Sequence, residues 1–318
     1  METVLVSGGA GFIGSHTCEK LIQLGYRVLC IDNLNDYYDP RFKQQNLAKL
    51  KKSKSFSFYK ADICNRSEMG KLFSKNRIDR IIHLAARAGV RPSIEDPGLY
   101  AKVNISGTIN LLEEARKNSI KYFVFGSSSS VYGNCREVPF SEDMQLDRPI
   151  SPYAATKKAG ELICYAYHHL YNINISCLRF FTVYGPRGRP DMAPYKFLSR
   201  IAEGIPIDMY GDGSTSRDYT YVADIVDGII ASMERLDGYQ IFNLGNSNPI
   251  TLSEFIAVIE SVTGKQAVIK REKMQPGDVD TTYSDITKAA RMLGYRPKVQ
   301  FREGISMMYD WLKNHDKR

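Results

Sequence analysis

The sequence predicts an α/β protein in which a parallel sheet is covered by helices on both faces, with a smaller lobe towards the C-terminus. Over the first 180 residues, short apolar runs rich in β-branched residues alternate with segments of helical periodicity. The first of these runs ends in glycines that lead directly into a helical segment. After Phe181 the pattern changes to prolines, glycines and short helical segments, which indicates the second lobe.

The elements follow one another without a long low-complexity linker. Strands are expected at residues 2–9, 27–32, 55–63, 80–86, 122–128 and 173–180. Helices are expected between them at residues 12–26, 69–76, 104–119 and 151–171. Because strands and helices alternate, the strands should be parallel and buried on both faces of the sheet.

Composition excludes several classes of protein. No apolar run approaches the roughly 20 residues that cross a bilayer, so we expect no membrane partner. The formal charge of +8 comes largely from residues 49–55 and 312–318, which look like solvated surface, so we expect no nucleic-acid partner. The six cysteines form no Cys-x-x-Cys pair and the five histidines show no ligand spacing. We therefore expect reduced thiols, no metal site and a cytoplasmic location.

The turn after the first strand has the glycine spacing of a dinucleotide site. Residues 8–14 read GGAGFIG, and glycines there let the backbone approach a pyrophosphate at the positive end of the following helix. Asp32 ends the next strand, where a carboxylate can accept hydrogen bonds from the ribose hydroxyls of adenosine. This unit predicts a Rossmann-type, doubly wound sheet. The acid would repel a 2′-phosphate, which favours NAD over NADP.

The segment at residues 151–171 predicts a helix that places the phenol of Tyr153 and the ammonium of Lys157 one turn apart on one face. Core packing does not require this pair. Both residue types also occur on solvated helix faces, so the pair by itself leaves a structural and a catalytic interpretation open.

Motifs in order along the chain decide between these interpretations. The segments SGGAGFIGSH, IDNLND, ADI, HLAA, VN, SSSSVYG, SPYAATK, LRFFTVYGP and SRDYTYVADIVDGI run from residue 4 to about residue 229. With FNLG, PGDV and SDITKA further on, they resemble the nucleotide-sugar epimerases of the extended short-chain dehydrogenase/reductase family. IDNLNDYYDPRFK, AGVRPSIEDP and FFTVYGPRGRPDMA are most similar to the branch of that family that acts on UDP-glucuronate.

The resemblance implies a catalytic set and a bound NAD. Tyr153 would take the proton of the sugar 4-hydroxyl, and Lys157 would hold the nicotinamide ribose. Ser128 would hydrogen-bond the reacting hydroxyl. An ammonium and an oxidised nicotinamide nearby would favour the phenolate of Tyr153. The implied cofactor-binding residues are Gly8, Gly11, Phe12, Ile13, Gly14, Asp32, Asn33, Asp62, Ile63, Leu84, Ala85, Ala86, Asn104, Ser127, Tyr153, Lys157 and Phe180.

The resemblance also implies a site for a UDP-sugar. Arg217 would bind its phosphates, Asp278 its uridine ribose and Arg91 its phosphates or sugar. By the same resemblance, Thr182 and Arg189 would surround the C6 carboxylate of a glucuronate. A planar guanidinium suits a carboxylate, whereas a neutral 6-hydroxymethyl group would leave its charge without a partner. The full implied substrate-binding set is Arg91, Ser128, Thr182, Arg187, Arg189, Met192, Arg217 and Asp278. The structural alternatives are a surface pair of Arg217 with Asp218, a turn role for Asp278 and a surface role for Arg187 and Arg189.

Three functions remain open from the sequence. The first is 4-epimerisation of UDP-glucuronate through a transient 4-keto sugar. The second is 4-epimerisation of neutral UDP-sugars (UDP-glucose or UDP-N-acetylglucosamine), and the third is a non-catalytic NAD-binding module. Serines stand at positions 129 and 130, where related dehydratases and decarboxylases carry an acid, which argues against those reactions.

The resemblance also predicts how the chain is organised. Residues 1–180 would form the NAD-binding domain, to which a segment at about 218–245 returns, and residues 181–318 the UDP-sugar lobe. Related enzymes pair through a helix bundle. We therefore expect a homodimer in which the helices after Val103 and Tyr153 supply the contact.

Overall fold

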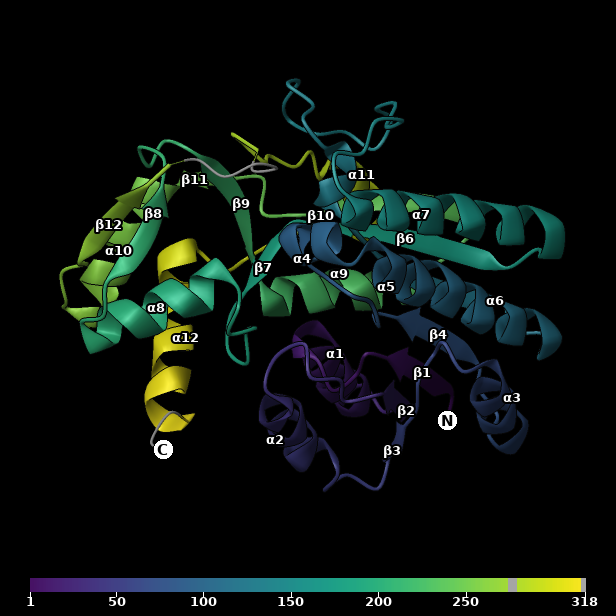
Figure 1. The fold of residues 1–318 in the computed structure, drawn as a ribbon. Helices are drawn as coiled ribbons and strands as arrows, with labels where there is room; N and C mark the ends of the chain where they lie inside the picture. The colour runs from purple at the N-terminus through teal and green to yellow at the C-terminus, as the bar shows by residue number, and fades with distance from the viewer. Residues whose placement is uncertain (274–278, 316–318) are drawn as a thin grey trace.

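The computed structural model describes residues 1–273 and 279–315. One part is a seven-stranded sheet with helices on both faces, and a second group of elements packs beside it (Figure 1). The strand order of the large sheet is β10-β6-β5-β4-β1-β2-β3, and every neighbouring pair is parallel. The predicted doubly wound parallel sheet is therefore confirmed.

The order reverses between β1 and β4, which lie side by side although two strands separate them in the sequence. In open α/β sheets a ligand binds outside the carboxyl ends of the strands at such a reversal. The bounds of the seven strands are β1 Thr3–Ser7, β2 Arg27–Asp32, β3 Phe56–Lys60, β4 Arg80–His83, β5 Tyr122–Ser128, β6 Asn174–Phe180 and β10 Tyr239–Leu244.

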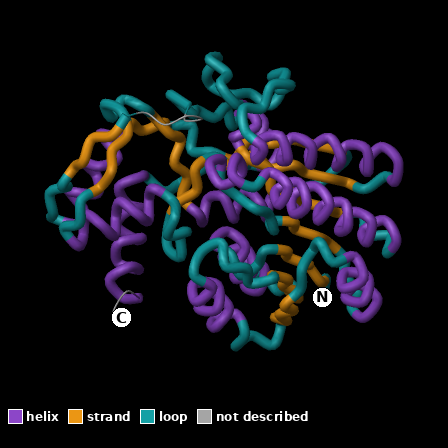
Figure 2. Tube along the Cα trace, in the orientation of Figure 1, coloured by secondary structure: helices purple, strands orange, loops and turns teal. Residues whose placement is uncertain are grey.

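A hydrophobic cluster lies on each face of the large sheet. Successive residues of a strand belong to different clusters, because their side chains point to opposite faces. Val4 and Val6 belong to one cluster, whereas Leu5 between them belongs to the other. Helices α1 (Phe12–Gln23), α2 (Pro40–Leu50) and α9 (Val222–Glu234) pack together on the first side. Helices α3 (Arg66–Lys75), α6 (Gly107–Lys117) and α7 (Pro152–Tyr171) pack together on the other (Figure 2).

Short elements connect β4 to α6. The sequence predicts a strand to residue 86 and a helix from residue 104, but β4 ends at His83. Helices α4 (Val90–Glu95) and α5 (Pro97–Ala101) follow, and a π-turn at Lys102–Ser106 leads into α6. A 3-10 turn at Ser129–Tyr132 follows β5. Because α2, α4 and α5 are short or weakly periodic, the apolar pattern does not reveal them.

The second group of elements contains two small sheets. One has the order β11-β9-β7 and the other pairs β12 with β8. Helix α11 (Thr287–Leu293) packs against β10 and α9. The remaining bounds are β7 Thr182–Tyr184, α8 Ala193–Glu203, β8 Ile207–Tyr210, β9 Ser216–Tyr221, β11 Pro249–Thr251, α10 Leu252–Thr263, β12 Ile269–Glu272 and α12 Phe301–His315.

The chain crosses between the two parts more than once. After β9 it forms α9 and then β10, which pairs with β6 at the edge of the large sheet. Tyr219, Phe255 and Phe301 of the small part belong to the same hydrophobic cluster as Val4 and Val6 of the large sheet. The two parts therefore share buried apolar surface. Within the described residues, no helix combines the length and apolar character needed to span a membrane.

Candidate functional site

A cavity of about 910 Å³ lies at the carboxyl ends of the large sheet, between the two parts of the molecule. Its wall is formed by the turn after β1, the ends of β2, β4, β5 and β6, the starts of α4 and α7, and the loop after β7. The cavity therefore lies at the point where the strand order reverses, between β1 and β4.

The glycine turn at one end of the cavity leaves no room for side chains. Gly8 has φ +70°, and a Cβ there would lie 2.7 Å from the backbone nitrogen of Ala85. A Cβ on Gly14 would lie 2.2 Å from the carbonyl oxygen of Gly8. The turn leads into the N-terminus of α1, whose backbone N–H groups favour an anion. These residues fit the pyrophosphate of a dinucleotide.

Asp32 sits next to this turn, and its carboxylate is ordered by the surrounding chain. It accepts hydrogen bonds from the backbone nitrogens of Leu34 at 2.8 Å and Ala10 at 3.3 Å. The ammonium of Lys43, on α2, lies 3.6 Å from the carboxylate and donates to Asn35 at 3.2 Å. Sequence reasoning missed Lys43, because it lies beyond the glycine motif and only the position of α2 brings it to Asp32.

Nearly all the residues expected to bind the cofactor do line the cavity. They are Gly8, Gly11, Phe12, Ile13, Gly14, Asp32, Asn33, Asp62, Ile63, Leu84, Ala85, Ala86, Ser127, Tyr153, Lys157 and Phe180. This set combines the glycine cradle, a carboxylate for a ribose and apolar walls. A dinucleotide such as NAD fits it.

Asn104 is an exception, because its side chain forms hydrogen bonds within the chain. It is buried, accepts from the backbone nitrogen of Arg87 at 2.8 Å, and donates to Arg87 oxygen and Thr156 Oγ1, both at 3.0 Å. Asn104 is absent from the described lining of the cavity. These hydrogen bonds connect the chain after β4 to α7.

Helix α7 presents the predicted tyrosine and lysine to the cavity. Ser151 caps the helix by accepting from the backbone nitrogen of Ala154, and Pro152 occupies the first turn. Tyr153 follows at once, and Lys157 Nζ donates to the carbonyl oxygen of Gly126 at 2.7 Å. Ser128, at the end of β5, lines the same cavity.

Burial has the largest influence on the protonation of this tyrosine and lysine. Burial raises the pKa of Tyr153, while a hydrogen bond with Ser128 and the charge of Arg189 act in the opposite direction. Burial lowers the pKa of Lys157 to about 8. The chain alone therefore keeps the phenol of Tyr153 protonated at neutral pH.

The other end of the cavity carries the residues expected at the sugar. Arg91, Thr182, Arg189 and Met192 all line it. Asp191 holds Arg189 with hydrogen bonds from Nε at 3.0 Å and from Nη2 at 2.5 Å. The ring of Tyr37 lies 5.2 Å from the guanidinium carbon. The guanidinium therefore has a carboxylate partner within the chain, contrary to the premise that a neutral sugar would leave it unpaired.

Arg187 is absent from the lining of the cavity. Its Nη2 donates to Glu19 on α1 at 2.7 Å, and its guanidinium contacts the ring of His16. His16 in turn contacts the carbonyl oxygen of Pro186 at 2.9 Å. Through this pairing with Glu19, Arg187 links the loop after β7 to α1.

The remaining two predicted substrate residues are Arg217 and Asp278. Arg217 Nη1 donates to the carbonyl oxygens of Ser216 at 2.8 Å and Asp280 at 3.3 Å, outside the described cavity lining. It does not pair with Asp218, which is buried and accepts from Ser284 Oγ at 2.5 Å. Asp278 lies outside the described residues.

A buried ion pair lies behind Ser127 and Ser128. Glu161 of α7 and Arg179 of β6 form two hydrogen bonds of 2.9 Å, and both side chains are 1% exposed. Ser127 Oγ also donates to Glu161, at 2.7 Å. Glu161 therefore links α7 to β6 through Arg179 and to β5 through Ser127. Glutamate and arginine look like surface residues in a helix and a strand, so the sequence offers no indication of their burial.

Comparison with known proteins agrees with this geometry. The sequence pattern of the family described as GDP-mannose 4,6 dehydratase matches residues 5–308. A UDP-glucuronate 4-epimerase from Thermodesulfobacterium geofontis is 46% identical over 316 residues, which cover 99% of this chain and 97% of that protein.

Two solved structures are similar in fold along nearly the whole chain. UDP-glucuronic acid 4-epimerase from Bacillus cereus, in complex with UDP-glucuronic acid and NAD, is 37% identical with a TM-score of 0.92, covering 98% of this chain and 99% of that one. UDP-glucose 4-epimerase from Thermotoga maritima, with UDP-glucose, is 33% identical with a TM-score of 0.92, covering 99% and 100%. The chain thus belongs to the GDP-mannose 4,6 dehydratase family and is similar to its UDP-glucuronate 4-epimerases.

Proposed function

We propose that this chain is an NAD-dependent 4-epimerase that interconverts UDP-glucuronate and UDP-galacturonate. The observation that carries the proposal is a single cavity that holds Tyr153 and Ser128 together with Thr182 and Arg189. The first two suit proton transfer at a sugar hydroxyl, and the last two suit a carboxylate. The likeness to epimerases that act on or bind this sugar supports the assignment.

The chemistry divides between the cofactor and the chain. The glycine cradle would hold NAD, which would supply a reversible hydride acceptor for C4 and a positive charge that favours the phenolate. Tyr153 Oη takes the proton of the 4-hydroxyl and later returns one to the new alcohol. Ser128 Oγ, which also contacts Ser130 Oγ at 3.1 Å, would orient the reacting hydroxyl. Lys157, anchored on Gly126, lies on the same helix face one turn away.

The transient 4-keto form of a glucuronate creates a hazard that the sugar end of the cavity can control. Its ketone is two carbons from the carboxylate carbon, so the group is a β-keto acid that loses carbon dioxide when the carboxylate aligns with the ketone. Hydrogen bonds from Arg189 and Thr182 would hold the carboxylate ionised and out of that alignment. Arg187 would support this loop through Glu19 and His16.

Replacing Arg189 by alanine tests whether this residue binds the C6 carboxylate. A charge-assisted hydrogen bond contributes about 1.5–3 kcal/mol, so Arg189→Ala should lower kcat/KM for UDP-glucuronate by roughly ten- to a hundredfold. Turnover of UDP-glucose should fall much less. Both substrates are measured side by side, with the products identified by NMR, where a leaked 4-keto pentose would also appear. Equal losses on the two sugars would contradict the assignment.

A second candidate is 4-epimerisation of neutral UDP-sugars. The pairing of Arg189 with Asp191 favours it, because a neutral C6 group would not leave that guanidinium unpaired. The likeness to a UDP-glucose 4-epimerase also supports it. Incubation of the protein with UDP-glucuronate and with UDP-glucose, followed by separation of the products, distinguishes the two functions.

We further propose that Arg91, Arg217 and Asp278 contact the UDP group of the substrate.

We also propose a homodimer that forms through α7. Leu162 and Tyr165 on this helix are 61% and 53% exposed, and Ala155 and Ala166 extend the exposed apolar stripe. Leu162→Glu should therefore weaken the dimer and shift the sedimentation coefficient towards that of a monomer. Leu24→Glu, at the exposed end of α1, is the matched control and should leave the sedimentation unchanged. Equal sedimentation of parent and Leu162→Glu would contradict this contact.

The compartment is a further proposal. All six cysteines are free thiols in the structure. Free thiols suit a reducing environment, and we therefore propose that the protein works in the cytoplasm.

A further inference from the structure

Asp191 faces the same cavity as the sugar-binding residues, although the resemblance assigns it no role. Its two carboxylate oxygens accept from Nε and Nη2 of Arg189 at 3.0 Å and 2.5 Å. The Arg189 side chain is 18% exposed and that of Asp191 38% exposed. The pair therefore lies at the wall of the cavity, partly withdrawn from water.

The geometry of this pair leaves one edge of the guanidinium for a second acceptor. A guanidinium has five N–H groups in a plane, and Asp191 occupies the edge formed by Nε and Nη2. The edge formed by Nη1 and the second N–H of Nη2 can bind another carboxylate in the same plane. The ring of Tyr37 lies 5.2 Å from the guanidinium carbon and favours a cation there. A sugar carboxylate at that edge would share one cation with Asp191.

A guanidinium shared between Asp191 and the substrate changes the relative binding of neutral and acidic sugars. When Asp191 is present, the pair is neutral before any sugar binds, so a neutral C6 group leaves no unpaired charge. The attraction for an acidic sugar is also reduced, because its carboxylate meets a second carboxylate beside the same guanidinium. Without the negative charge of Asp191, Arg189 would be a partly buried cation that only an acidic sugar could neutralise.

We propose that Asp191 is a specificity-determining residue whose carboxylate shares Arg189 with the substrate, so that the pocket accepts neutral as well as acidic sugars. The inference rests on the proposed function, because it assumes that Arg189 meets the C6 group of a UDP-sugar. This role and a purely structural role for Asp191 predict opposite changes in affinity for the acidic sugar. If Asp191 only positioned Arg189, removing Asp191 would weaken binding of the acidic sugar. If Asp191 competes with the sugar carboxylate, removing Asp191 strengthens that binding.

Asp191→Asn is the direct test, because it removes the charge and keeps the shape. We expect KM for UDP-glucuronate to fall about three- to tenfold, since the full charge of Arg189 then acts on the sugar carboxylate. The inhibition constant of UDP-glucose against this reaction should rise by a similar factor. Inhibition can be measured whether or not UDP-glucose is turned over. A ratio of the two constants that stays unchanged or moves the other way would overturn the proposal.

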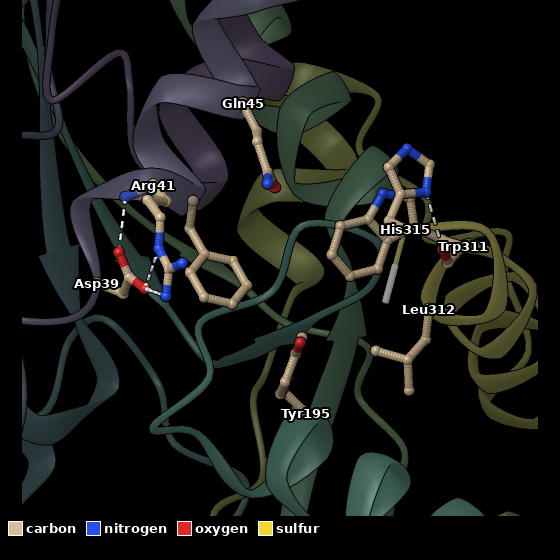
Figure 3. Close-up of a pocket in the computed structure, with 8 residues that line it drawn as sticks. Asp39, Arg41, Gln45, Tyr195, Trp311, Leu312 and His315 are labelled. Atoms are coloured by element: carbon tan, nitrogen blue, oxygen red, sulfur yellow. Dashed lines mark hydrogen bonds and ion pairs between the residues drawn. The ribbon is translucent and has the colours of Figure 1, made fainter. Parts of the chain in front are cut away.

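The chain offers a matched control for this variant. Asp39 and Arg41 form a pair with the same two-residue spacing, at 2.7 Å and 2.5 Å, beside a separate cleft lined by Tyr195, Trp311 and His315 (Figure 3). Asp39→Asn changes the net charge of the protein by the same amount as Asp191→Asn. Both constants should stay at the parent values in Asp39→Asn. An equal shift in the two variants would show a general charge effect and overturn the role of Asp191.

The double variant Arg189→Ala/Asp191→Asn adds a second readout. In Arg189→Ala the carboxylate of Asp191 loses its partner and would repel the sugar carboxylate. Removing that charge as well should make kcat/KM for UDP-glucuronate at least threefold higher in the double variant than in Arg189→Ala. No recovery would contradict the proposal. If the parent protein itself fails to convert UDP-glucuronate, the proposed function fails and this inference with it. If the parent converts it and the variants do not behave as stated, only the inference fails.

Discussion

Tyr153→Phe is expected to lose epimerisation by about a thousandfold or more while the protein keeps its fold and its bound NAD. The phenol hydroxyl is the proposed acceptor of the 4-hydroxyl proton, and the change removes only that group. The ring keeps its edge-to-face contact with Tyr100, with ring centroids 6.2 Å apart. The helix start is also kept, because Ser151 and Pro152 form it without the phenol.

Turnover of UDP-glucuronate by purified Tyr153→Phe is compared with that of the parent, and the nucleotide released by acid is quantified for both. Tyr100→Phe is the matched control. It also removes a buried hydroxyl, one that donates to the carbonyl oxygen of Ala88 at 2.7 Å, but leaves Tyr153 intact. Tyr100→Phe should therefore keep most of the activity. Turnover by Tyr153→Phe above roughly a tenth of the parent rate would be too high for a missing general base.

Glu161→Ala is expected to give the largest loss of stability. The Glu161 carboxylate accepts two hydrogen bonds from Arg179 and one from Ser127, and it is also 3.3 Å from Lys158 Nζ. Its removal leaves the guanidinium of Arg179 buried without its carboxylate, which costs about 3–5 kcal/mol of the free energy of unfolding. Lys158, which is 22% exposed on its side chain, loses less because water reaches it.

Urea unfolding of parent and Glu161→Ala measures this free energy. Glu203→Ala, at the exposed end of α8, is the control and should change the free energy of unfolding by less than about 0.5 kcal/mol. Glu161→Gln keeps one acceptor for Arg179 and should fall between the control and the alanine variant. A loss below about 1 kcal/mol in Glu161→Ala would mean that the pair is not the support for α7 that its geometry indicates.

The fold and much of the site could be predicted because they depend on residues close together in the sequence. The glycine spacing at residues 8–14 works only between a strand and a helix, and Asp32 follows at the end of the next strand. Tyr153 and Lys157 share a helix face whatever packs around them. Their spacing and the alternation of strands and helices were therefore visible in the chain itself.

The tertiary structure decided which polar side chains face the cavity and which are already paired. Arg187 and Asn104 looked like ligand contacts, but Glu19 and Arg87, distant in sequence, take up their hydrogen-bonding groups. Conversely, Lys43 lies beside Asp32 only because α2 packs there. A buried charge requires a partner, and the sequence names the charge without naming the partner. For Glu161 with Arg179, which are 18 residues apart, that partner is set by the packing of α7 against β6.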